Sequence, residues 1–268
     1  MSRKPIRSIV FLGGGRITSA LLAGLHLAEY DKPILVHDRN TSKLANLKRA
    51  YGVIVESDIH RALVASDLLI LAVRPGSVRE LLSNIGEFSR PIVAVSLAAG
   101  IPLATLRKLT SESVEWARAM PSPVCRSGNG LTGLAFSRRF PSAAKRKVLD
   151  FFALTGTVLE LPERKIDAFT VSYSPSHGYH ALSALASAAE ACGLDRRTAL
   201  AAAAHALADS ITSWRRGEQP LPELLDESAT PGGIAAAVMH TMDQAGYRQM
   251  VKRSLFAGMR QAKKNARR

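Results

Sequence analysis

Three consecutive glycines, placed between an apolar run and a helical pattern, constrain the fold of this chain more than any other feature. Ile9 to Leu12 suit a buried parallel strand, and Gly13 to Gly15 follow at once. From Arg16 onward, apolar residues recur at helical spacing. Glycine tightens such a turn and lets backbone N–H groups approach a pyrophosphate at the positive end of the next helix. The pattern predicts a strand, a phosphate-binding turn and a helix. The third small position of the G-x-G-x-x-G/A pattern falls on Thr18, whose methyl and hydroxyl groups must fit where the helix packs on the strand.

A second apolar strand ends where the ribose of a dinucleotide is expected to bind. Pro33 to Val36 lead into His37-Asp38-Arg39-Asn40, about twenty residues after the glycines. An acid at this place accepts the ribose hydroxyls of NAD, whereas a neighbouring Arg pairs with the 2′-phosphate of NADP. Arg39, within a donor-rich turn, favours NADP, and Asp38 leaves NAD open. Asn40 or Thr41 also suits the cap of the helix expected at 42–50.

Composition limits the class of protein. The chain has 268 residues, 47% of them hydrophobic, enough for two packed domains. Its two cysteines, Cys125 and Cys192, form no CxxC or Cys/His cluster, so we expect no disulfide framework, no metal site and a cytoplasmic location. The basic segment 1–7 is followed by an apolar stretch that the glycines interrupt, unlike a secretory signal. No apolar segment is long enough to span a membrane.

The net charge of +14 raises the question of a nucleic-acid partner. Residues 247–268 contain many Lys and Arg and no acid. We interpret this tail as a final helix with a solvated basic face and a loose end, because no nucleic-acid-binding motif or aromatic cluster accompanies the charge.

The order of elements predicts the architecture. Strand-like and helical segments alternate through the first 160 residues, with strands expected at 68–73, 91–97, 114–119 and within 151–161. From Lys165 onward the sequence is Ala-rich and helical. We therefore predict an α/β Rossmann-type domain with a parallel sheet over 1–161, followed by an all-α domain over 162–268 that carries dimerisation and substrate binding.

Several segments, in matching order and spacing, resemble the pyrroline-5-carboxylate reductase family, which reduces a cyclic imine acid to proline. They are residues 11–25, 71–75 (L-A-V-R-P), 95–101 (V-S-L-A-A-G-I), 118–121 with 128–132, and 230–233 (T-P-G-G) with 242–248. The resemblance implies a Rossmann-type cofactor domain, a helical dimerisation domain, and NADPH or NADH as hydride donor. A small imine substrate and a homo-oligomer follow as expected partners.

The resemblance also implies which residues hold the cofactor. The glycine turn and the start of its helix would line the pyrophosphate, the turn after the second strand would meet the adenosine ribose, and the third strand's end would pass beside the cofactor. Ala98 and Ala99 would lie near the nicotinamide, and Arg74 stands where the family usually has Lys. The cofactor residues implied are Gly13, Gly15, Arg16, Ile17, Arg39, Asn40, Ala72, Val73, Arg74, Pro75 and Ala98.

The expected substrate loops depart from the family pattern. Residues 120–125 replace the usual M-P-N-T-P-A, residues 173–179 replace S-G-S-G-P-A-Y, and Ile234 and Ala235 stand where the family has Thr. Pro175 removes an N–H donor, and a hydroxyl group is lost at Ala235. We expect substrate contacts from Met120, Ser122, Ser174, Gly232, Gly233 and Ile234.

His177, Tyr173 and Ser176 are the candidates to orient substrate or donate a proton, because His titrates near neutral pH. Each could instead be a packing or capping residue. Two alternatives stay open: a reductase for a different, more apolar imine, and a non-catalytic dinucleotide-binding protein. A β-hydroxyacid dehydrogenase is disfavoured because residues 181–191 contain no Lys.

Overall fold

The computed structural model describes residues 9–267 except 65, 89, 139 and 218, so the basic segment 1–7, Ser8 and Arg268 lie outside the described residues. The chain forms two compact units, Met1–Tyr173 with Ala257–Arg268 (unit 1) and Ser174–Phe256 (unit 2). This division differs from the boundary expected after residue 161. Helix α7 (Glu163–Ser172) stays with the first unit because its Ile166 is buried there, and the chain returns to that unit at its end.

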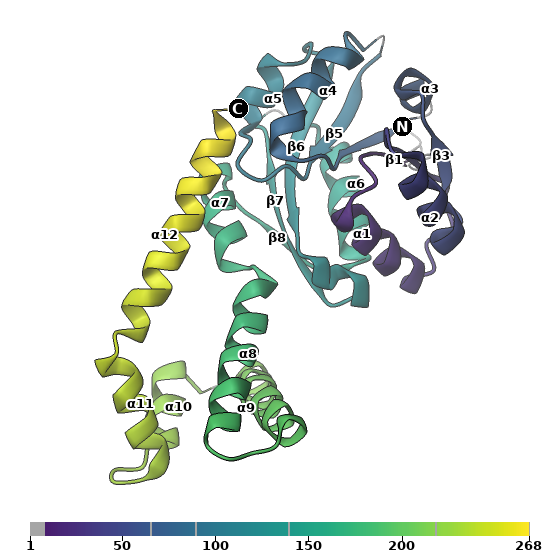
Figure 1. Cartoon of the computed structure of the whole chain (residues 1–268). Coiled ribbons are helices and arrows are strands. Elements are labelled where there is room, and N and C mark those ends of the chain that lie inside the picture. Colours follow the sequence, from purple (N-terminus) through teal and green to yellow (C-terminus); the bar gives the residue numbers. More distant parts are fainter. Residues whose placement is uncertain (1–8, 65, 89, 139, 218, 268) are drawn as a thin grey trace. The chain divides into compact units, whose positions relative to one another are not determined.

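Unit 1 is built on a sheet with helices packed against it (Figure 1). The described residues supply eight strands to this sheet, in the order β3-β2-β1-β4-β5-β6-β7-β8. Neighbouring strands are parallel except β6 and β7. The predicted α/β fold class is confirmed. The strands are β1 (Ile9–Leu12), β2 (Ile34–His37), β3 (Ile54–Glu56), β4 (Leu68–Leu71), β5 (Ile92–Ser96), β6 (Val114–Pro121), β7 (Gly130–Phe136) and β8 (Gly156–Glu160).

The antiparallel pair corrects the expectation of a wholly parallel sheet. Between β6 and β7 the chain makes only the 3-10 helix η2 (Pro123–Ser127). A parallel return needs a crossover of a dozen or more residues, so this short connection turns the chain back antiparallel. The closing strand is also shorter than expected, because residues up to Ala153 belong to helix α6 (Ser142–Ala153), which buries Val148, Phe151 and Phe152.

Helices cover both faces of the sheet. Alternate side chains of β1 point to opposite faces, so Ile9 and Phe11 join one core and Val10 and Leu12 the other. The first core includes α1 (Arg16–Leu27), α2 (Thr41–Tyr51) and α6, and the second α3 (Ile59–Val64), α4 (Val78–Ile85) and α5 (Leu103–Lys108). Strands β1 and β4, in the interior of the sheet, are buried on both faces, which explains their continuous apolar sequence.

Among its described residues, unit 2 consists of helices and the turns that connect them. It contains α8 (Pro175–Ala191), α9 (Arg196–Arg216), α10 (Leu221–Ser228), α11 (Ile234–Gln244) and the first part of α12 (Tyr247–Ala266). Helices α8 and α9 pack against each other through small side chains, of which Ala186, Ala199 and Ala203 are buried. Large apolar side chains such as Ile211 and Trp214 stay exposed. Across the described part of the chain, no helix is long and apolar enough to cross a membrane.

Candidate active site

The glycine turn holds three strand ends together. The Gly13 N–H donates to the His37 carbonyl at 2.7 Å, and Gly13 has a φ of +113°. A β-carbon there would lie 2.8 Å from the carbonyl oxygen of Ala72. Only glycine combines this backbone conformation with such close approach, so Gly13 fixes β1 against the ends of β2 and β4.

The next part of the turn faces open space. Gly15 is the N-cap of α1, no acidic residue lies in the first turn of that helix, and a β-carbon at Gly15 would meet no atom within 4 Å. Arg16 is exposed at the first helical position, and Ile17 packs at the edge of the core. The positive end of a helix with bare backbone in front of it suits a pyrophosphate. The residues present therefore fit a dinucleotide.

Thr18 explains the departure at the third position of the glycine pattern. Its side chain is fully buried, and its hydroxyl donates to the Gly13 carbonyl at 2.5 Å. The hydroxyl is thus satisfied where a glycine or alanine would leave the carbonyl without this donor. Thr18 therefore fits where the helix packs on the strand, and its hydroxyl stabilises the turn.

The turn after β2 is tied to the glycines through Asp38. One carboxylate oxygen accepts from the Gly14 N–H at 2.8 Å, and the other accepts from the Asn40 N–H at 2.8 Å. Asn40 caps α2, since its side-chain oxygen accepts from the Lys43 N–H at 3.0 Å. The capping role considered from sequence is confirmed, and the carboxylate connects the two turns.

Arg39 lies in the same turn with its guanidinium in solvent. It pairs with Glu80 of α4 at 3.1 Å, and the two side chains are 79% and 59% exposed. An ion pair this exposed contributes little stability. Its guanidinium is therefore available to exchange the carboxylate for a stronger phosphate partner.

The remaining expected cofactor residues follow β4 and β5. The Ala72 N–H donates to the Leu12 carbonyl at 2.8 Å, and Val73 and Arg74 lead into the 3-10 helix η1 (Pro75–Ser77). Ala98 is buried and its N–H donates to the Ser96 hydroxyl at 3.2 Å. Because β2, β1, β4 and β5 are adjacent and parallel, their carboxyl ends form one edge, where open α/β sheets bind ligands. The structure thus brings all the expected cofactor residues to that edge.

The expected substrate residues of unit 1 lie at the end of β6. Met120 is buried in a small cluster with Ala135 and Ile166, against which Ala99 packs. The Ser122 hydroxyl caps η2 by accepting from the Val124 N–H at 3.3 Å. Beside it, burial raises the pKa of Cys125 to about 11, so this thiol stays protonated at neutral pH.

Tyr173 is held at the end of unit 1. Its hydroxyl accepts from the Leu131 N–H at 2.7 Å, and its ring lies 5.5 Å from that of Phe169. Tyr173 therefore makes the packing contact weighed from sequence, and its hydroxyl, which accepts one hydrogen bond, still has an O–H group to donate.

The other expected substrate and catalytic residues belong to unit 2 and lie at the starts of α8 and α11. Ser174 caps α8 and its hydroxyl lies 2.6 Å from that of Ser176, while the His177 N–H donates to the Ser174 carbonyl at 3.1 Å. Pro175 stands at the first helical position, where the missing N–H costs no helical bond.

Before α11, Gly232 has a φ of +77°, and Gly233 donates through its N–H to the Thr230 carbonyl at 2.9 Å. Ile234 opens that helix with 88% of its surface exposed. Among the described residues, no group of three or more His, Cys, Asp or Glu is placed to hold a metal ion.

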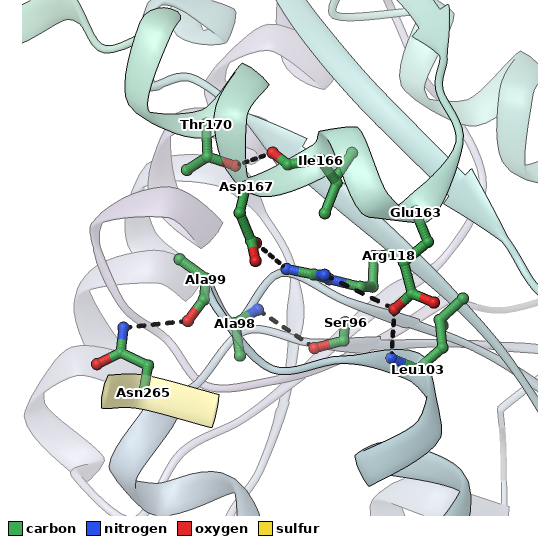
Figure 2. A network of polar contacts seen from close by, with 10 residues as sticks. All are labelled: Ser96, Ala98, Ala99, Leu103, Arg118, Glu163, Ile166, Asp167, Thr170 and Asn265. Carbon is green, nitrogen blue, oxygen red and sulfur yellow. Dashed lines mark hydrogen bonds and ion pairs between the residues drawn. The ribbon is translucent and has the colours of Figure 1, made fainter. Parts of the chain in front are cut away.

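Arg118 of β6 and two carboxylates of α7 form a charged network that sequence reasoning missed. Arg118 of β6 is 1% exposed and pairs with Asp167 at 2.5 Å and with Glu163 at 3.7 Å (Figure 2). Glu163 also accepts from the Leu103 N–H at 2.6 Å. The available signal was a charged residue inside an apolar strand, since such residues are buried only when paired.

Comparison with known proteins decides the family. A family model described as pyrroline-5-carboxylate reductase dimerisation matches residues 163–265, and one described as NADP oxidoreductase coenzyme F420-dependent matches residues 8–100. The pyrroline-5-carboxylate reductase of Methanosarcina acetivorans is 30% identical over 248 residues, covering 90% of this chain and 92% of that protein. This chain belongs to the pyrroline-5-carboxylate reductase family. The reductase of Corynebacterium melassecola is 29% identical, with 90% and 92% covered.

Solved structures of reductases in this family share the fold. A Plasmodium falciparum pyrroline carboxylate reductase with NADP bound has a TM-score of 0.87 at 21% identity, over 99% of this chain and 100% of that one. The Streptococcus pyogenes enzyme has a TM-score of 0.89 at 20% identity, over 96% and 98%. Both likenesses extend over the Rossmann-type and helical parts of the family fold.

Proposed function

We propose that this chain reduces 1-pyrroline-5-carboxylate to L-proline, using NADPH as the hydride donor. The observation that carries the proposal is the edge formed by β1, β2, β4 and β5, where bare backbone at Gly15 faces open space before α1, in a chain of this reductase family. The Plasmodium falciparum structure with NADP bound supports the same cofactor.

Hydride transfer to a protonated C=N bond needs position and charge more than a nucleophile. When bound, NADPH supplies the hydride. Gly13, Gly15, Arg16 and Ile17 then bind the pyrophosphate, while Arg39 and Asn40 take the adenosine ribose and its phosphate. The residues that border the cofactor are Ala72, Val73, Arg74, Pro75 and Ala98, at the ends of β4 and β5.

For the substrate, we assign contacts to Met120 and Ser122 in unit 1. In unit 2, the assignment covers Ser174, Gly232, Gly233 and Ile234. Tyr173, Ser176 and His177 are the proposed proton donors or orienting groups. Support comes from the Ser174–Ser176 hydroxyl pair, in which one O–H group donates to the other hydroxyl and the second can donate to a carboxylate.

Oligomerisation and location complete the proposal. The family model of the dimerisation region and the exposed apolar side chains of unit 2 support a homo-oligomer built through the C-terminal helices, a homodimer or a multiple of it. With two free cysteines, one buried and one exposed, the chain suits the reducing cytoplasm. A nucleic-acid role for the basic tail is disfavoured.

A second candidate is the reduction of a more apolar imine. Ile234 is exposed and Ala235 follows it, where the family has hydroxyl side chains. Loss of a polar contact disfavours a small carboxylate substrate and favours an apolar one.

One assay separates these functions. Oxidation of NADPH and of NADH is followed by absorbance with pyrroline-5-carboxylate and with a panel of larger cyclic imines lacking the carboxylate. Turnover with pyrroline-5-carboxylate at the highest kcat/KM is the expected result. Turnover with a panel imine alone supports the second candidate, and NADPH binding without any turnover indicates a non-catalytic dinucleotide-binding protein.

A further inference from the structure

The loop after β5 has almost no side chains with which to hold its own shape. It runs through Ala98, Ala99 and Gly100, and Gly100 has a φ of +80°. Alanine and glycine offer no polar side chain, and glycine loses the most conformational freedom on ordering. From within the loop's own neighbourhood, the Ser96 hydroxyl accepts from the Ala98 N–H at 3.2 Å. Within the loop, the Ile101 N–H donates to the Ala98 carbonyl at 3.4 Å, and further contacts come from other parts of the chain.

The end of α12 contacts the loop after β5. The side-chain amide of Asn265 donates to the Ala99 carbonyl at 3.1 Å, although the two residues are 166 positions apart (Figure 2). A β-carbon at Gly100 would lie 2.4 Å from the carbonyl oxygen of Ala262, so the loop and the helix touch backbone to backbone. A glycine is required for this approach, which makes the contact specific.

The orientation of the Asn265 amide is itself fixed. Its oxygen accepts from the side-chain amide of Gln261 at 3.1 Å, one turn earlier on α12. With the oxygen engaged in this way, the NH2 group is the one left to face Ala99. The tail of α12 is also anchored on α7, because a β-carbon at Gly258 would lie 2.8 Å from a methyl carbon of Val171.

The far end of the same loop is held from a different element. Glu163 of α7 accepts from the Leu103 N–H at 2.6 Å and also pairs with Arg118. The segment from Ala98 to Leu103 is therefore clamped at one end by α12 and at the other by α7 (Figure 2). The C-terminal tail, expected from sequence to be loose, is docked where it ends.

We propose that Asn265 is a positioning residue that holds the Ala98–Gly100 loop in the shape required to receive the nicotinamide end of NADPH. The inference rests on the proposed function, which assigns this loop to the cofactor. Asn265 acts through the Ala99 carbonyl. Because the loop is already ordered before the cofactor binds, the entropic cost of binding is smaller. Asn265 therefore contributes to cofactor affinity and to the geometry of hydride transfer.

The decisive variant is Asn265→Asp, which keeps the shape of the side chain but turns an oxygen toward the Ala99 carbonyl. Lys264→Ala is the matched control, since Lys264 is the neighbouring residue on α12 and is exposed. A chain ending at Gln261 removes the whole contact and serves as the second variant. Thermal unfolding of all three proteins establishes that unit 1 remains folded.

Three measurements are made on the full oligomeric enzyme. Hydrogen exchange of residues 97–101 without cofactor should rise about fivefold in Asn265→Asp, the change expected for one lost hydrogen bond. The Kd for NADPH, by calorimetry, should rise by about the same factor. The primary isotope effect with C4-deuterated NADPH should also change, while Lys264→Ala matches the wild type in every measurement.

A purely structural anchor would lower the melting temperature and leave loop exchange and NADPH affinity at their wild-type values, and that result would overturn the proposal. Failure of the proposed function is distinguishable, because loop exchange needs neither substrate nor turnover. If pyrroline-5-carboxylate is not reduced but exchange and NADPH affinity change as stated, the positioning role stands and the reaction must be reassigned.

Discussion

At the scale of single residues, Arg39 is where the choice between NADPH and NADH is best tested. Among the described residues, its guanidinium pairs with the exposed carboxylate of Glu80. A charge-assisted bond from Arg to a 2′-phosphate is worth about 1.5–3 kcal/mol. Arg39→Ala should therefore raise the Kd for NADPH about tenfold or more, and change that for NADH by less than about threefold, as measured by fluorescence titration.

Glu80→Gln is the matched control for this prediction. It removes the carboxylate that competes for Arg39, so NADPH affinity should stay unchanged or rise by a few fold. If Arg39→Ala lost equal affinity for NADPH and NADH, Arg39 would not contact the 2′-phosphate. Selection between the two cofactors would then be assigned to the Asp38 carboxylate.

Gly24 is a second residue at which the structure predicts the effect of a substitution on stability. It lies on α1, and a β-carbon there would be 2.3 Å from the Cys125 carbonyl oxygen of η2. An alanine normally stabilises a helix by about 1 kcal/mol relative to glycine. Here it must push η2 away, so Gly24→Ala should lower the free energy of unfolding by about 1–3 kcal/mol.

Gly178→Ala on α8 tests the same change in open space, because its β-carbon would meet no atom within 4 Å. Urea unfolding of both variants should show a loss for position 24 and no loss for position 178. Unchanged stability of Gly24→Ala would mean that α1 and η2 separate without cost.

At the scale of elements, the pairing of Arg118 with Asp167 joins β6 to α7. Arg118 is almost wholly buried, and removal of one partner from a buried pair costs about 3–5 kcal/mol. Asp167→Ala should therefore lower the free energy of unfolding by roughly this amount in urea titrations.

The exposed pair of Lys145 and Glu160, at 2.6 Å, provides the comparison. Glu160→Ala should cost less than about 1 kcal/mol. If both variants lost a similar free energy of unfolding, the buried pair would stabilise the protein no more than the exposed pair does.

Some elements could be predicted from the sequence and others could not. The glycine turn, the cap at Asn40 and the alternation of strands and helices follow from local patterns, because each depends on residues close in the chain. Strand β7 could not be predicted in this way, since its antiparallel direction is set by the short connection η2 and its pairing with β6 and β8. Arg118 with Asp167 and Asn265 with Ala99 join residues far apart, and no local period marks such pairs.

At the scale of the whole molecule, unit 2 leaves large apolar side chains uncovered within one chain. Ile211 of α9 is 53% exposed, and burial of such side chains drives association. Ile211→Lys should shift the protein toward monomers by size-exclusion chromatography with light scattering, because a lysine resists desolvation in an interface.

Val64→Lys is the control, because Val64 of α3 is an exposed apolar residue of unit 1. Its mass in solution should equal that of the wild type. A mass unaffected by Ile211→Lys would place the interface on other helices of unit 2.

The contact between Asn265 and Ala99 has a consequence for biosynthesis. A chain grows from its N-terminus, and the sheet of unit 1 can begin to fold as it emerges. Asn265 is synthesised 166 residues after Ala99, so the loop after β5 receives this contact only after α12 has been made. A polypeptide that has not yet been extended through α12 therefore carries the glycine turn and the strands of the sheet, yet is expected to capture the dinucleotide poorly until Asn265 has been added.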